Sequence, residues 1–184
     1  MHPRLAGLVD HLARTRAELL AAAEAVPAAD RERRPSPNRW TVAEVLDHLR
    51  MTEVGSATLL ARRIGRAREA GVGPDLEVGS VLGRLDHADV SQGGGLRVAP
   101  EVVQPTAGTR FDDALAGLAA SRAGLLDVVR LLEDVDATRV MARHAALGEI
   151  DAYQWLLFIG QHERRHLRQI EGIRAALAAS APAD

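Results

Sequence analysis

The sequence predicts an all-α protein, a four-helix bundle with a long crossover between its second and third helices. Hydrophobic residues make up 47% of the 184-residue chain and aromatic residues only 3%. Much of the apolar content is alanine, the strongest helix former. Apolar residues recur at helical spacing in four segments, and no segment shows the alternation typical of a β-strand. We therefore expect residues 1–184 to form one helical domain.

The first two helices have recognisable boundaries. The first is expected over about 3–25, because the proline-containing segment 31–38 follows it. The second is expected over about 41–70. It opens at Thr41, and Glu44 three residues later completes the pattern of a capping box.

The third and fourth helices follow a long connection, and the connection itself is part of the prediction. The third is expected over about 109–133, with Asp112 at its third position. The fourth is expected to begin at Asp151, which forms a capping-box-like pair with Gln154. Residues 71–108 form the crossover, in which 78–90 could hold a short helix. A connection of this length in a small domain is usually disordered or functional, for example as a lid.

Composition excludes several classes of protein. The chain has no cysteine, which rules out disulfides, thiolate metal sites and cysteine nucleophiles. A net charge of −2 gives no broad electrostatic reason to bind nucleic acid or an anionic membrane. No stretch of about 20 apolar residues predicts a membrane span, and the first residues do not resemble a signal peptide. A cytoplasmic protein is expected.

Three of the seven histidines occupy unusual positions. His162 and His166 lie four residues apart, on the apolar stripe of the fourth helix. Buried imidazoles need polar partners, and histidines at this spacing are close enough to share one metal ion. His48, at the edge of the stripe of the second helix, is the best third ligand. Three histidines with an open position would be typical of a catalytic site. A hydrogen-bonded core histidine is the alternative for each.

Residues 162–166 also match H-E-x-x-H, in which a glutamate between two zinc ligands is the general base of a protease. We interpret the match as accidental. The chain lacks the glycine and third histidine of the extended protease motif.

Two stretches carry a family resemblance, residues 40–49 (WTVAEVLDHL) and residues 162–170 (HERRHLRQI), supported by residues 144–148 (HAALG). With these motifs in its helices, the chain resembles the DinB-like superfamily of four-helix-bundle metalloproteins, whose fold is also called DinB/YfiT-like. The resemblance implies that His48, His162 and His166 bind one divalent metal, often nickel or zinc. It also implies a homodimer in many members and, in some relatives, thiol S-transfer or isomerisation with a low-molecular-weight thiol.

Several other side chains have competing interpretations. Glu53 either supports the site, as an acceptor or general base, or pairs with an arginine such as Arg122. Gln169 could orient a histidine ring or a substrate, or be a satisfied core amide. Glu163 is better explained as solvated helix-surface charge. His144 could line the mouth of a pocket, although a structural role is more usual there.

The leading hypothesis is a small metal-dependent enzyme, acting on a small molecule by hydrolysis or by thiol S-transfer. A bound divalent ion lowers the pKa of water or of a thiol, and with no cysteine in the chain the thiol would be a cosubstrate. Two alternatives stay open. One is a non-catalytic bundle in which metal serves stability, or metal or stress sensing, and the other is a carrier of small hydrophobic molecules.

Overall fold

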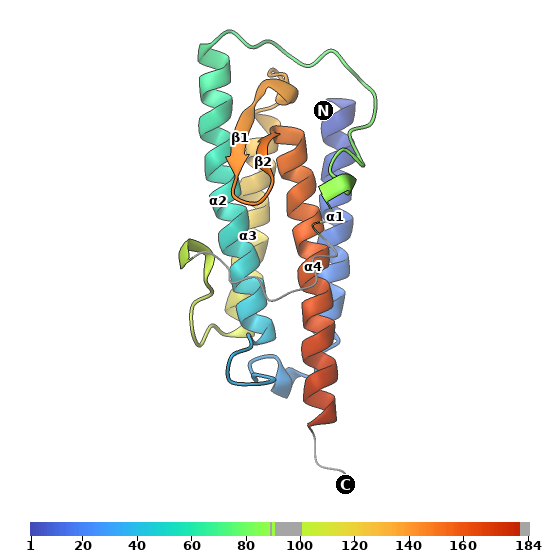
Figure 1. Cartoon of the computed structure of the whole chain (residues 1–184), viewed down its shortest axis with the longest axis vertical. Helices are drawn as coiled ribbons and strands as arrows, with labels where there is room; N and C mark the ends of the chain where they lie inside the picture. Colours follow the sequence, from blue (N-terminus) through green and yellow to red (C-terminus); the bar gives the residue numbers. More distant parts are fainter. Residues whose placement is uncertain (89, 91–100, 181–184) are drawn as a thin grey trace.

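Four long helices form the bundle in the computed structural model, which describes residues 1–88, 90 and 101–180 (Figure 1). The helices are α1 (Pro3–Glu24), α2 (Val42–Glu69), α3 (Phe111–Arg130) and α4 (Ala152–Ala179). α1 packs against α4 and α2 against α3. α1 and α4 run in one direction along the bundle, and α2 and α3 run in the other (Figure 1). The predicted four-helix bundle is confirmed.

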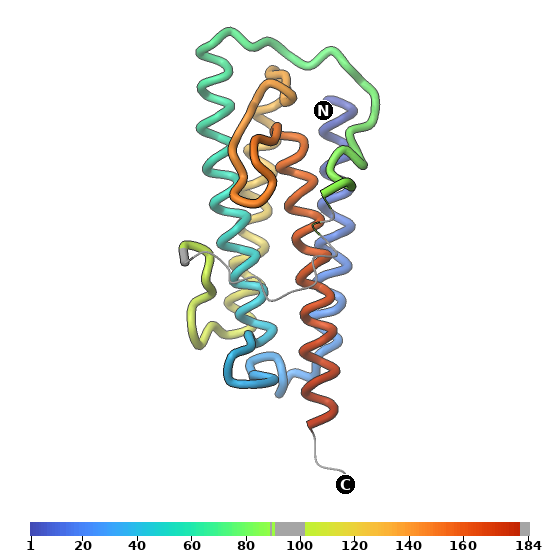
Figure 2. The backbone as a smooth tube through the Cα atoms, in the orientation of Figure 1, coloured from blue at the N-terminus to red at the C-terminus, as the bar shows by residue number. Residues whose placement is uncertain are grey.

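The crossover between α2 and α3 is long because these helices are parallel. The chain leaves the end of α2 and must return along the bundle, about 40 Å for a helix of this length, before α3 can begin (Figure 2). Within 78–90, the expected short helix is only the 3-10 turn η2 (Asp86–Ala88), and a second such turn, η3 (Glu101–Val103), precedes α3. Residues 89 and 91–100 of the predicted crossover lie outside the described residues.

The first part of the crossover is tied to α1 and α4 through one carboxylate. Asp75 accepts hydrogen bonds from Arg4 of α1 and from the Tyr153 hydroxyl of α4, each at 2.8 Å. Burial alone would raise the pKa of Asp75, but bonds from the Glu77 backbone N–H, from Tyr153 and from Arg4 outweigh it and lower that pKa. The carboxylate therefore stays charged and holds the crossover against the helices.

The starts of α1, α2 and α4 are capped by neighbouring residues, and the start of α3 is not. The capping boxes Thr41–Glu44 of α2 and Asp151–Gln154 of α4 are both formed, as predicted. The predicted start of the third helix near residue 109 was wrong. α3 begins at Phe111, whose backbone N–H donates to Glu32 Oε1 at 3.0 Å. The capping residue lies in a loop 79 residues earlier in the chain, so no local sequence pattern predicts it.

The expectation of no strands was also wrong, because a small antiparallel hairpin precedes α4. β1 (Met141–His144) pairs with β2 (Gly148–Asp151), and Ala142 lies opposite Ile150, both buried. Four residues a strand are too few for alternation to be recognised. The hairpin lies across the face between α2 and α4 (Figure 1).

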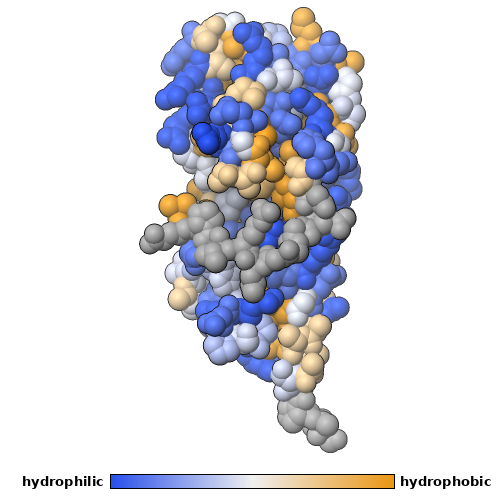
Figure 3. Space-filling model, viewed as in Figure 1, coloured by the Kyte–Doolittle hydropathy of each residue, from blue (hydrophilic) through white to orange (hydrophobic). Residues whose placement is uncertain are grey.

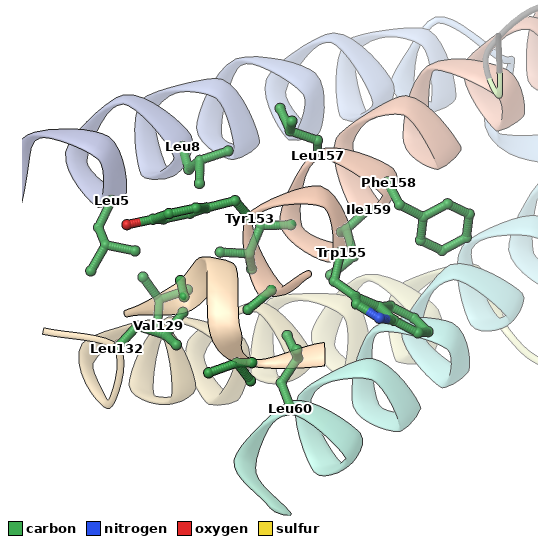
Figure 4. Close-up of a cluster of buried hydrophobic side chains, with 14 of the residues drawn as sticks. Leu5, Leu8, Leu60, Val129, Leu132, Tyr153, Trp155, Leu157, Phe158 and Ile159 are labelled. Carbon is green, nitrogen blue, oxygen red and sulfur yellow. The ribbon is translucent and has the colours of Figure 1, made fainter. Parts of the chain in front are cut away.

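Side chains from all four helices fill the core. Figure 4 shows the part next to the hairpin, where Leu5 and Leu8 of α1 lie beside Tyr153, and Leu60 of α2 and Val129 of α3 belong to the same cluster. Among the described residues, no helix has the length and apolar content needed to cross a membrane.

We expect Gly160→Ala to destabilise the fold, because a side chain at this position of α4 would meet side chains of α1. A Cβ at Gly160 would lie 2.5 Å from His11 Nε2, and overpacking typically costs about 1–3 kcal/mol. In a His11→Ala background the clash is gone, and the helix propensity of alanine should make the same change stabilising by up to about 1 kcal/mol. Urea unfolding of the wild type, the two single variants and the double variant measures these changes in stability. An equal cost in both backgrounds would contradict it.

Candidate metal centre

Three imidazoles converge between α2 and α4. His48 comes from α2, and His162 and His166 come from successive turns of α4. One ring nitrogen from each lies within 4.8 Å of the other two. His162 Nε2 is 3.4 Å from His48 Nε2 and 3.0 Å from His166 Nε2. The inward nitrogens of the three rings thus face one another.

The outward nitrogens of two rings have fixed acceptors. His48 Nδ1 lies 2.6 Å from the backbone carbonyl of Val103, in η3 of the crossover. His166 Nδ1 lies 2.8 Å from Gln169 Oε1. Because a carbonyl oxygen only accepts, each Nδ1 carries the proton, and each Nε2 presents a lone pair to the centre.

The surroundings keep the three rings uncharged. Burial, followed by the neighbouring His166 and His48, lowers the pKa of His162 well below its ordinary value. Burial and the nearby His48 lower the pKa of His166 to about 3, and burial lowers that of His48. Neutral imidazole is the form that binds a metal ion.

The donor set fits a cation better than it fits an internal hydrogen-bond network. The two lone pairs of His48 and His166 both face His162 Nε2, which can donate at most one proton. In at least one of these contacts two lone pairs therefore face each other with no proton between them, and a cation at the centre would remove that repulsion. Three imidazole nitrogens are a ligand set typical of zinc, and imidazole also suits nickel.

Aromatic rings border the three histidines on two sides. Trp40 packs against His48 and His166, with ring centroids 5.0 Å and 6.4 Å apart. Phe158 stacks on His162 at 5.3 Å and 16° between planes. Apolar walls of this kind exclude water and strengthen electrostatic interactions within a site.

A buried network of ions lies next to the histidines and unites the four helices. It consists of Glu53 of α2, Glu163 of α4, Arg16 of α1 and Arg122 of α3. Arg16 contacts Glu163 at 2.6 Å and Glu53 at 3.0 Å. Arg122 contacts the same two carboxylates at 2.8 Å and 2.6 Å. Each carboxylate is only 2% exposed, and two positive charges balance two negative ones.

This network settles how two of the sequence candidates are placed. Both carboxylate oxygens of Glu53 accept bonds from Arg16, Arg122 or Ser121, so the geometry matches the arginine-pairing interpretation. The interpretation of Glu163 as solvated charge was wrong. It shares the buried face of α4 with Ile159 and His166, and a buried carboxylate is tolerated there because two guanidinium groups compensate it.

A short recurring pattern could have revealed the arginines. Residues 12–19 and 118–125 both read L-A-x-[ST]-R-A-x-L, with leucines on the apolar stripe one turn before and after the polar pair. The two copies act reciprocally. Arg16 donates to the carbonyl of Leu118 at 2.9 Å, and Arg122 donates to that of Leu12 at 2.7 Å. Thr15 and Ser121 then bond Glu163 and Glu53, respectively.

A cavity of about 10 Å³ separates the network from His162 and is lined also by Leu49, Thr52 and Ile159. That volume is close to the least that holds one water molecule. At most one water molecule therefore fits between the charged network and His162.

The remaining candidate, His144, belongs to the hairpin. His144, at the end of β1, packs on Phe158 with centroids 4.3 Å apart, and so adjoins the wall of the site. Its ring also caps the turn, because Nδ1 accepts the backbone N–H groups of Ala146 and Leu147.

The fold and the histidine cluster together define this protein as a helical bundle with a candidate metal centre. The model of the DinB superfamily matches residues 11–170. YuaE of Bacillus subtilis (strain 168), described as an uncharacterized protein, is 31% identical over 150 residues, which cover 77% of this chain and 81% of YuaE. The crystal structure of TT2238, described as a four-helix bundle protein, superposes with a TM-score of 0.60 at 20% identity, over 91% of this chain and 98% of that one.

The chain belongs to the DinB superfamily. The likeness to TT2238 independently supports the fold.

We expect Glu163→Gln to lower the free energy of unfolding far more than a nearby surface substitution does. The substitution leaves two buried guanidinium groups facing one carboxylate, and breaking a buried pair costs about 3–5 kcal/mol. Arg164→Gln is the matched control, since its ion pair with Glu18 is exposed at both ends and should contribute less than about 1 kcal/mol. Equal free energies of unfolding for the two variants, measured in urea, would contradict a structural role for the network.

Proposed function

We propose that this protein is a metalloenzyme in which His48, His162 and His166 hold one divalent ion, zinc or nickel, and that it acts on a small molecule. The single observation that carries the proposal is the set of three inward Nε2 atoms, 3.0 Å and 3.4 Å apart, which have at most one proton to share. Zinc and nickel are chosen because the ligand atoms are all imidazole nitrogens.

The reaction class follows from what such an ion supplies. When bound, a divalent ion on three imidazoles acts as a Lewis acid and lowers the pKa of a coordinated water or thiol. Hydrolysis and thiol S-transfer both need such a nucleophile. In S-transfer the thiol must come from a cosubstrate of low molecular weight, because the chain contains no cysteine.

The chain's other residues hold the ligands in place and exclude water. The Val103 carbonyl and Gln169 orient His48 and His166 through their Nδ1 protons. Trp40 and Phe158 cover the flanks of the rings. Glu53 affects the site indirectly, because its carboxylate binds Arg16, Arg122 and Ser121. We assign it the positioning of α2 and not proton transfer.

A non-catalytic metal-binding bundle is distinguished by the dependence of stability on metal. The buried ion network links all four helices without a metal. If the ion were needed chiefly for folding, its removal by a chelator would lower the melting temperature strongly. We expect a modest fall instead, together with binding of added imidazole or thiol at an open position.

Protein purified without an affinity tag should contain about one zinc or nickel ion per chain, measured by mass spectrometry. His162→Ala should abolish that content, because it removes the nitrogen that faces both other ligands. His87→Ala, a change at an exposed histidine, is the control and should retain the metal. Metal-free wild-type protein that gains no stability from added zinc or nickel would refute the proposal.

Gln169→Met should weaken metal binding about 10- to 100-fold, which is typical for loss of the group that orients a ligand. Methionine preserves the length of the side chain but offers no oxygen to His166 Nδ1. Competition with a chromogenic chelator measures the affinity. Glu171→Gln, an exposed change two residues along α4, should have no effect, and a matching loss in both variants would show that Gln169 has no specific role.

A further inference from the structure

A short segment of the crossover, residues 103–106, is held on α2 by its own backbone. We call it the strap. The carbonyl of Val103 lies 2.6 Å from His48 Nδ1, and the backbone N–H of Thr106 donates to Asp47 Oδ2 at 2.9 Å. Asp47 and His48 are consecutive residues of α2, and each is only 4% exposed. Two buried side chains of one helix therefore hold both ends of the strap.

Burial contributes little to the attachment of the strap. Gln104 and Thr106 are exposed, and Val103 and Pro105 are only partly buried. Val102, which precedes the strap, is 81% exposed. Figure 3 shows apolar atoms projecting at the left edge of the molecule, at the level where Figure 1 draws η3 in yellow-green. A segment with few buried apolar contacts opens easily, so its order depends on the hydrogen bonds that hold it.

One of these hydrogen bonds depends on the state of the histidine centre. A neutral imidazole carries one proton, on either Nδ1 or Nε2. With the proton on Nδ1, His48 donates to the Val103 carbonyl. With the proton on Nε2, it donates instead toward His162 Nε2, 3.4 Å away, and the lone pair of Nδ1 repels the carbonyl oxygen. Without a cation, Val103 and His162 therefore compete for one proton.

Cation binding at the histidines ends this competition. When Nε2 of His48 binds a cation, its lone pair is occupied and the proton is confined to Nδ1. The ring then donates to the Val103 carbonyl at all times. Two linked equilibria favour each other by the same factor. Metal binding therefore strengthens the attachment of the strap, and detachment of the strap weakens metal binding.

We propose that residues 103–106 are a metal-responsive strap, which is held on α2 while the three histidines bind their ion and is released when the ion is lost. The inference rests on the proposed function, because it concerns the regulation of the same metal centre. Its consequence is that any interaction that draws the strap away from α2 lowers the affinity of the centre for its metal.

Amide hydrogen exchange tests the strap directly, by NMR on the full ¹⁵N-labelled chain with and without equimolar zinc. Removal of zinc should speed the exchange of the Thr106 N–H about three- to tenfold, the factor expected for loss of one neutral hydrogen bond. The Phe111 N–H is the control and should not change, because it donates to a distant carboxylate, Glu32 Oε1 at 3.0 Å, that adjoins no metal ligand in sequence. Equal changes at both amides, or none at Thr106, would overturn the proposal.

The reciprocal effect is tested with a variant that leaves α2 and its charges unchanged. Thr106→Pro removes the N–H that donates to Asp47. A hydrogen bond to a carboxylate is about twice as strong as a neutral one, so this change removes most of the attachment. Zinc affinity, measured by competition with a chromogenic chelator, should fall about two- to tenfold. An affinity equal to that of the wild type would overturn the proposal.

Ala107→Pro is the matched control for the effect of a proline. The Thr109 N–H closes a turn on the Thr106 carbonyl at 3.3 Å, and Gly108, the third residue of that turn, has a φ of 77°. These features define a type II turn, in which proline is common at the second position. Ala107→Pro keeps the Thr106 N–H and should retain the wild-type zinc affinity. Equal losses of affinity in the two variants would also overturn the proposal.

The zinc content of the same samples separates this inference from the proposed function. If about one zinc ion binds per chain and the exchange of Thr106 does not depend on it, only the strap proposal fails. If the chain takes up no zinc, the proposed function fails and the strap proposal fails with it.

Discussion

The buried ion network is the interaction on which the site depends. Each of the four helices contributes one charged side chain, and each arginine contacts both carboxylates. A network of this kind adds little net stability compared with apolar packing, but its four short contacts would lengthen if one helix rotated or slid against another. His162 precedes Glu163 directly, and His48 precedes Glu53 by little more than one turn. The geometry of the imidazoles is therefore inherited from the network, and α1 and α3 influence the site without supplying a ligand.

Local signals predicted most of the fold, and long-range contacts account for what was missed. The starts of α2 and α4 were predicted because their capping boxes lie within four residues of sequence. The start of α3 was not, because Glu32 caps Phe111 from another loop. The hairpin was missed because four-residue strands carry no periodic signal.

The candidate site likewise contains residues that local signals predicted and residues that only long-range contacts explain. His162 and His166 could be recognised from helical spacing alone, because imidazoles on an apolar stripe are conspicuous. The acceptor of His48 could not, since it is the backbone carbonyl of Val103, which any residue would provide. Glu163 was misjudged because a lone acidic residue on a helix suggests solvent exposure until its arginines are placed beside it. Those partners lie 147 and 41 residues away.

The near-symmetry of the network accounts for the unequal contributions of α2 and α4 to the proposed metal centre. The matching L-A-x-[ST]-R-A-x-L segments of α1 and α3 bind Glu53 and Glu163 in the same way. Corresponding positions on α2 and α4 therefore face the same space. Five residues before Glu53 stands His48, and five residues before Glu163 stands Phe158. One half of the frame therefore supplies a nitrogen ligand where the other supplies an apolar ring stacked on His162. With three nitrogens and a ring in place of a fourth, α2 and α4 together offer a cation three nitrogen ligands and not four.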